Sequence, residues 1–218
     1  MSAADTPQPP DALLLISSGC PFCATVLKGL AELVKAGRVA RLEVVNLTVR
    51  PEAAERYGVR GVPWLRLGPF ELEGLRSEAE LARWAERAGT QSGMADYLSE
   101  LLAAGELQKV VHLVSDDSGR FTALLSLLTD PDTDLHVRLG IGAVVETLAG
   151  SAGLEAMIAP LAELTRHADP RTRGDACHYL ALTRGPAARP HIAALLQDSD
   201  ADVREVAAES LDAIASRK

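Results

Sequence analysis

The chain has few cysteines and no long apolar run. Its 218 residues include three cysteines, too few for a disulfide framework and one short of a four-cysteine zinc site. No stretch approaches the roughly 18 to 20 apolar residues of a membrane span. The N-terminal sequence lacks a basic segment, and its apolar run over 12–16 is shorter than a signal-peptide core. We therefore predict a cytoplasmic protein with no membrane partner.

The second half of the chain is short of cations. Residues 1–90 contain 11 Lys and Arg and 11 Asp and Glu, whereas residues 91–218 contain 11 and 19, so the net charge of -8 lies entirely in the second part. An acidic surface repels phosphate backbones. We therefore expect no nucleic-acid partner. The 47% of hydrophobic residues is enough for a packed core.

The first part of the chain alternates strand and helix signals. A proline-rich, flexible leader is predicted over 1–10, and Ser77 with Glu80 has the spacing of a capping box. The predicted elements are a strand over 12–16, a helix from Pro21 that Gly37 ends, a strand over 39–49, a helix over 51–57, strands over 63–67 and 70–73 around a Gly68-Pro69 turn, and a helix over 78–87. This β-α-β-α-β-β-α order predicts a parallel first pair of strands and a final antiparallel hairpin.

Only helix signals follow residue 89. We predict a polar linker over 90–93 and a helical domain over 94–218, after an α/β domain over 11–89. Three segments beginning at Asp130, Asp169 and Asp198 each open a helix, and an arginine lies near each start (Arg138, Arg173 and Arg204). The intervals of about 39 and 29 residues resemble helix-pair repeats of HEAT type, which bind proteins. The predicted first helices span 135–148, 172–182 and 203–214; partner helices span 154–165 and 190–196, and 97–128 supplies a degenerate pair.

Two cysteines form a C-x-x-C motif, Cys20-Pro21-Phe22-Cys23, between the first strand and the first helix. A cysteine just before a helix meets the positive end of the helix dipole and free N–H groups, which favour the thiolate. Cys20 is therefore the candidate nucleophile. Cys23, one turn later, is placed to resolve a mixed disulfide formed by Cys20. Phe22 offers an apolar contact beside the sulfurs, and Pro21 fixes the turn.

A second motif, Val62-Pro63-Trp64, makes the resemblance specific. Together with the C-x-x-C, it makes residues 11–88 similar to the thioredoxin and glutaredoxin superfamily. The resemblance implies that Pro63 is cis and faces the cysteines, and that the backbone of Val62 pairs with bound substrate. It also implies a thioredoxin-like α/β fold followed by the all-α HEAT-like repeats.

The sequence departs from that family at several positions. Leu14 stands where thioredoxins keep a buried acid, so Cys23 must lose its proton by another route. Ser18 replaces the tryptophan that commonly precedes the motif, and Trp64 replaces the threonine after the proline, where it is placed to cover the sulfurs or narrow substrate choice. The residues that hold glutathione in glutaredoxins are missing over 68–78, which argues against glutathione dependence.

The residues support more than one function. Our main prediction is a thiol-disulfide oxidoreductase that needs no cofactor, with a protein client docked by the repeats and a reductase or reductant as second partner. The alternatives are a non-catalytic adaptor or assembly factor, and a sulfur or metal carrier that uses both thiols. Cys177 and the five histidines (His112, His136, His167, His178 and His191) are expected to be packing or surface residues. The three repeat arginines are expected to bond the aspartates of the preceding turns.

Overall fold

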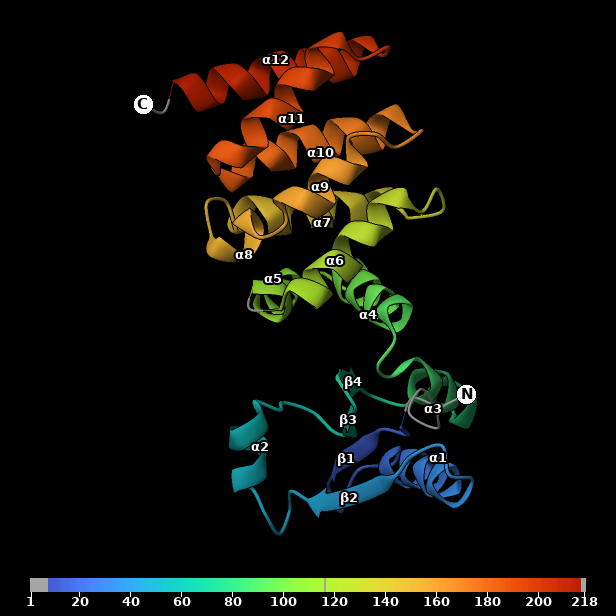
Figure 1. Ribbon diagram of the computed structural model, residues 1–218. Helices are drawn as coiled ribbons and strands as arrows, with labels where there is room; N and C mark the ends of the chain where they lie inside the picture. The colour runs from blue at the N-terminus through green and yellow to red at the C-terminus, as the bar shows by residue number, and fades with distance from the viewer. Residues whose placement is uncertain (1–7, 116, 217–218) are drawn as a thin grey trace. The chain divides into compact units, whose positions relative to one another are not determined.

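The computed structural model describes residues 8–115 and 117–216. These residues form two compact units, which divide between Met94 and Ala95. The first unit is a small mixed sheet with helices, and the second is entirely helical (Figure 1). Of the predicted leader over 1–10, the first seven residues lie outside the described part. No described helix is both long enough and apolar enough to cross a bilayer.

The first unit contains a four-stranded sheet in the order β2-β1-β3-β4. Strands β1 and β2 are parallel, whereas β3 is antiparallel to both β1 and β4. The predicted parallel pair and antiparallel hairpin are therefore confirmed. The strands are β1 (Asp11–Ile16), β2 (Arg41–Asn46), β3 (Trp64–Leu67) and β4 (Phe70–Glu73), and the helices are α1 (Cys23–Lys35), α2 (Glu52–Tyr57) and α3 (Glu78–Arg87).

Helices α1 and α3 cover one face of the sheet. Paired residues on neighbouring strands share a face, so Leu14, Leu65 and Leu72 point to the same side. Phe70, also on this side, packs against Trp84 of α3 with ring centroids 4.8 Å apart. Leu81 of α3 in turn lies against Gly29 of α1, and the C-x-x-C turn connects α1 to the carboxyl end of β1. The capping box predicted at the start of α3 is present, since Ser77 Oγ accepts from Glu80 N and Glu80 accepts from Ser77 N.

Strand β2 is shorter than the predicted 39–49. The Asn46 side chain accepts from Thr48 N at 2.9 Å, and this local turn ends the strand. At the other end, the buried Val39 belongs to the turn that follows α1, where its N–H bonds Leu33 O. Local hydrogen bonds thus end β2 on both sides, although the Val- and Leu-rich sequence continues beyond it.

The predicted linker over 90–93 is mostly helical. Helix α4 (Gln91–Ala103) starts inside it, because Thr90 Oγ1 accepts from Gly93 N at 3.0 Å and so caps the first turn. Gly93 lies against Arg87, whose backbone a side chain at this position would overlap. The glycine permits close packing here, and it does not mark a flexible segment.

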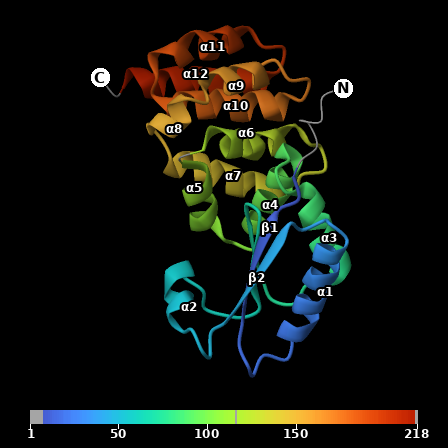
Figure 2. The same ribbon diagram turned by 60° about the horizontal axis from the view of Figure 1, so that its bottom comes forward.

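The second unit stacks helices in successive layers, and α7, α10 and α12 lie side by side in both views (Figures 1 and 2). Each of these three helices begins after an aspartate that accepts from backbone N–H groups of its first turn: Asp134, Asp169 and Asp200. The helices after α4 are α5 (Leu107–Ser115), α6 (Ser118–Ser126), α7 (Leu135–Thr147), α8 (Ala152–Glu155), α9 (Ile158–Leu164), α10 (Pro170–Thr183), α11 (Arg189–Ala194) and α12 (Ala201–Ala215), with 3-10 turns at Leu127–Thr129, Pro186–Ala188 and Leu195–Gln197.

The predicted helix over 154–165 is divided into α8 and α9. Pro160 has no N–H with which to bond the carbonyl of Ala156, and its ring would collide with that carbonyl in a continuous helix. The chain breaks at Ala156 and Met157 and restarts at Ile158. The partner helix predicted over 190–196 is similarly short, because it tightens into a 3-10 turn from Leu195.

Candidate functional site

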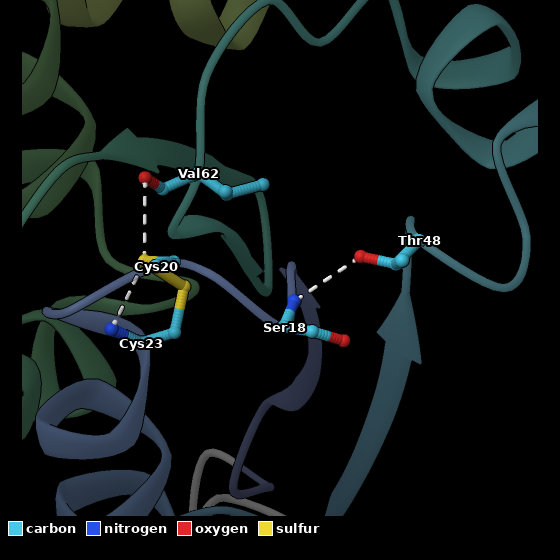
Figure 3. Close-up of a disulfide and its surroundings, with 5 residues drawn as sticks. All are labelled: Ser18, Cys20, Cys23, Thr48 and Val62. Atoms are coloured by element: carbon cyan, nitrogen blue, oxygen red, sulfur yellow. Dashed lines mark hydrogen bonds between the residues drawn. A yellow bond between two sulfur atoms is a disulfide. The ribbon is translucent and has the colours of Figure 1, made fainter.

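The cysteine motif occupies the turn that joins β1 to α1. Cys20 N bonds Ser17 O at 3.2 Å and closes this turn. Ser18 N donates to Thr48 Oγ1 at 3.2 Å and ties the turn to the segment after β2 (Figure 3). Asn46 adds a contact to Ser18 Oγ. These hydrogen bonds could not be predicted from the sequence, because the partners are about 30 residues apart and carry no local signal.

Cys20 and Cys23 are joined by a disulfide, and they differ in exposure. Cys23 is the first residue of α1 and is 4% exposed, whereas Cys20 is half-buried. Cys23 N lies 3.1 Å from Cys20 Sγ and donates toward it. An N–H donor aimed at a sulfur stabilises negative charge on that sulfur. Of the two sulfurs, Cys20 is thus the one with both solvent access and a donor for its thiolate.

The second motif lies beside the first. The Val62–Pro63 peptide bond is cis, as the resemblance implies for this proline. Val62 O is 3.7 Å from Cys20 Sγ (Figure 3), a separation at which a reduced thiol donates a weak hydrogen bond. Pro63 is buried and Val62 half-buried. The fold thus brings together Cys20 and Val62, which are 42 residues apart in the chain.

The two residues between the cysteines face solvent. Pro21 is exposed, and Phe22 is 51% exposed although it is a large apolar side chain. An exposed phenylalanine next to a disulfide offers an apolar contact to a molecule that approaches the sulfurs.

Trp64 lies in the core on the other face of the sheet. Its side chain is 2% exposed and packs with Leu13 and Leu15. Its ring stacks on Tyr57 of α2 with centroids 5.7 Å apart. Trp64 therefore supports the backbone next to Pro63 and has almost no surface to offer a substrate, which differs from its predicted place over the sulfurs.

A buried apolar residue occupies the position that carries an acid in thioredoxins. Leu14 is fully buried in β1. No carboxylate at this position is available to take a proton from the buried Cys23.

Two of the three repeat arginines bond a different aspartate from the one predicted. Arg138 and Arg173 each reach the carboxylate of the following repeat, Asp175 at 2.7 Å and Asp198 at 2.7 Å respectively. Their remaining N–H groups donate to backbone carbonyls of the preceding turn, as do those of Arg204. Arg138 and Arg173 therefore link successive repeats, whereas Arg204 donates to Asp198 O of its own preceding turn, as predicted.

Cys177 and the histidines were expected to be packing or surface residues. Cys177 is fully buried, and burial raises the pKa of its thiol to about 11. His178 is exposed and lies 3.8 Å from Glu146. Across residues 8–115 and 117–216, no three histidine, cysteine or acidic side chains are placed to hold a metal ion.

Comparison with known proteins bears on the second unit. A family model of HEAT repeats matches residues 121–212. The repeats expected from the spacing of Asp130, Asp169 and Asp198 are therefore confirmed, and repeats of this kind mediate contacts between proteins. No curated protein matches the chain.

Proposed function

We propose that the first unit is a thioredoxin-like thiol-disulfide oxidoreductase and that the helical repeats bind its protein client. One observation carries the redox part: Cys20 Sγ lies 3.1 Å from Cys23 N and 3.7 Å from Val62 O, with Cys23 within disulfide reach. The first contact stabilises a thiolate, and Val62 O is next to the attacking sulfur. Structural cysteines, by contrast, are buried and inert.

The strand order supports the fold part of the proposal. A C-x-x-C that follows β1, a parallel β1–β2 pair and a β3–β4 hairpin preceded by a proline are the features that the resemblance implies. We assign the thioredoxin-like domain to residues 11–89 and the repeat domain to 94–218, with helix α4 spanning the boundary between them.

The reaction exchanges one disulfide for another. The Cys20 thiolate attacks a client disulfide, so that a mixed disulfide forms and one client thiolate leaves. Cys23 then loses its proton and attacks Cys20 Sγ, which releases the second client thiolate and leaves the Cys20–Cys23 disulfide. The client gains two electrons and two protons, and a dithiol reductant returns the pair to its reduced state. In the cytosol, where the sequence predicts the protein, such reductants are present.

Four residues around the sulfurs, Pro21, Phe22, Val62 and Pro63, are proposed to hold the client. The backbone of Val62 pairs with an extended client segment, as the resemblance implies, and Pro63 fixes the direction of that backbone. Phe22, with Pro21 beside it, supplies apolar contact. Trp64 acts through the packing of this loop and does not contact the client.

The repeats are proposed to raise the client's local concentration. Linking a binding surface to a reactive site makes the second encounter intramolecular, with an effective concentration that the link sets. The match to HEAT repeats over 121–212 supports a protein as the bound molecule. The same match favours a second function, a binding adaptor in which the cysteines do no chemistry.

Thiol titration separates these functions. The reduced Cys177→Ser protein and its Cys20→Ser derivative are alkylated with iodoacetamide across a pH series, and wild type is equilibrated with dithiothreitol and glutathione buffers. We expect Cys20 to react rapidly well below the pH of about 8.5 at which an ordinary thiol is half ionised. We also expect the pair to equilibrate as one two-electron couple.

The oxidoreductase proposal is wrong if Cys20 reacts no faster than an ordinary thiol and no reversible disulfide forms. The Cys177→Ser background removes the third thiol, so that every alkylated group belongs to the motif. If the redox result is negative while the repeats still bind a partner, the adaptor function stands alone.

A further inference from the structure

We propose that the groove between helices α10 and α12 binds a basic amphipathic helix of the client. This inference rests on the proposed docking role of the repeats, and it does not depend on the chemistry of the cysteines. The groove has a volume of about 580 Å³ and is lined by both helices from their first to their last turns.

The two helices run in the same direction, so the groove between them is elongated. We call this groove the trough. Arg173 near the start of α10 bonds Asp198 just before α12, so the two N-terminal ends lie together. Figures 1 and 2 both draw α10 and α12 side by side. The lining of α10 runs from Pro170 to Leu182, about 18 Å at 1.5 Å per residue. A trough of this length suits about three turns of a helix better than a compact small molecule.

The two ends of the trough have different chemistry. The acidic lining residues all lie in its first two-thirds, where Val203 and Val206 also line it: Asp175, Asp200, Asp202 and Glu209. Its last part is lined by Leu182, Ala213 and Ile214. Asp175 is paired with Arg138 of the neighbouring repeat. Within the part of the chain that the structure describes, Asp202 and Glu209 have no cationic partner.

This distribution of charge favours a partner with basic residues at one end. Arg171 also lines the trough, but it is paired with Asp169 at 3.3 Å and does not offset Asp202 or Glu209. A helix with lysine or arginine near one end would complement these carboxylates. Leucine or isoleucine near its other end would bury apolar surface on Leu182 and Ile214.

Helix α7 extends the apolar surface beside the trough. Counting from the capping aspartate of each helix, Leu139 of α7 occupies the position of Gly174 in α10, which lines the trough. Leu135 and Leu139 are 70% and 65% exposed, one helical turn apart. These leucines lie beside the acidic part of the trough, so they offer apolar surface to the aliphatic stems of the lysines on the bound helix.

Binding of a synthetic peptide tests the proposal. The probe is a fluorescein-labelled helical peptide of about 14 residues, with lysines in its first turns and leucines on one face of its last turns; a second peptide has glutamate in place of lysine. Anisotropy is measured on the Cys20→Ser/Cys23→Ser protein, so that no disulfide exchange contributes. We expect saturable binding of the lysine peptide only, weakened by added salt.

A matched pair of charge reversals locates the site. Asp202→Lys with Glu209→Lys should weaken binding of the lysine peptide about tenfold or more. Glu205→Lys with Asp212→Lys makes the same charge change at exposed positions of the same helix outside the trough, and should alter affinity less than about threefold. Asp202→Asn with Glu209→Gln keeps the side-chain shapes and should give an intermediate affinity, which guards against misfolding of the reversed variant.

Three results would overturn the proposal: equal losses in the two reversed pairs, equal binding of the two peptides, or no saturable binding by the unreversed protein. A small-molecule occupant would give the last of these. The redox titration is independent of all three results. A negative peptide-binding experiment therefore leaves the oxidoreductase proposal intact, and a negative redox titration leaves the binding result intact.

Discussion

The two units of the molecule distribute their important residues differently. In the sheet unit, the residues of the proposed redox site lie at one point, where the turn after β1 meets Val62 O. In the repeat unit, an aspartate cap and an arginine recur at the starts of three helices, and their partners change from helix to helix. We expect substitutions at the first to remove function with little effect on stability, and substitutions at the second to lower stability.

The cysteines illustrate the same difference. Cys20 is half-buried at a helix start with an N–H donor at 3.1 Å. Cys177 is fully buried within α10, and burial raises the pKa of its thiol to about 11. One residue type is thus placed to react in one unit and to fill space in the other.

The largest expected effect is on turnover. Cys23→Ser should stop catalytic reduction of a protein disulfide, because a mixed disulfide on Cys20 can no longer be resolved. The trapped complex should appear as one equivalent of client per protein on a non-reducing gel. Cys177→Ser is the control and should retain full turnover. Multiple turnovers by Cys23→Ser would show that the two cysteines do not act as a pair.

Next in size is the loss of the inter-repeat ion pair. Arg173 donates two hydrogen bonds to Asp198, with both side chains largely buried at 12% and 8% exposure. Arg173→Ala should therefore lower the free energy of unfolding by about 3 kcal/mol, measured by urea denaturation, because it leaves Asp198 unpaired. Reduction of a small disulfide, which needs no docking by the repeats, should not change at temperatures where the protein is folded.

Arg204→Ala is the matched control for that substitution. Arg204 bonds only the carbonyls of Asp198 and Ser199 and is exposed. Its removal should cost about 1 kcal/mol or less, because water can satisfy those carbonyls. Equal losses for the two arginines would contradict the importance of the buried pair.

Acid should weaken the same link. The Arg173 side chain, which donates to Asp198, lowers the pKa of that carboxyl below its ordinary value of 3.8. A lowered pKa means that the stabilisation is complete above about pH 4 and is lost as pH falls through the folded-state value. Asp198→Asn should be less stable than wild type at pH 7, and the gap should narrow in acid. A constant gap from pH 7 to pH 2 would contradict this linkage.

Local signals were enough to predict most elements. The helix over 78–87 follows from Ser77 and Glu80, and the α3 that the structure shows has the same bounds. Strand directions also followed from chain order, because a helical crossover leads to a parallel neighbour. The C-x-x-C and the Val62-Pro63 motif indicated the candidate site, and the fold brings Cys20 and Val62 into contact.

The features that could not be predicted from the sequence depend on contacts between residues far apart in the chain. Nothing near Ser18 indicates Thr48, and nothing near Arg173 indicates that Asp198 lies beside it. Trp64 is a second example, since a tryptophan after the proline fits either a substrate surface or a core, and only the packing of Tyr57 and Leu15 distinguishes them. The helical conformation of the predicted linker could not be read from its residues, because Thr90 and Gly93 are common both in loops and at helix starts.

The smallest expected effect belongs to Phe22, and it sharpens the contrast between function and stability. The ring is 51% exposed, so Phe22→Ala should change the free energy of unfolding by less than about 0.5 kcal/mol. It should slow reduction of a protein client roughly threefold to fivefold, since part of the ring's apolar surface no longer meets the client. Reduction of a small linear disulfide such as hydroxyethyl disulfide should be unchanged, because that molecule does not reach the ring's outer face. Equal slowing of the two reactions would indicate that Phe22 affects the reactivity of Cys20 and does not contact the client.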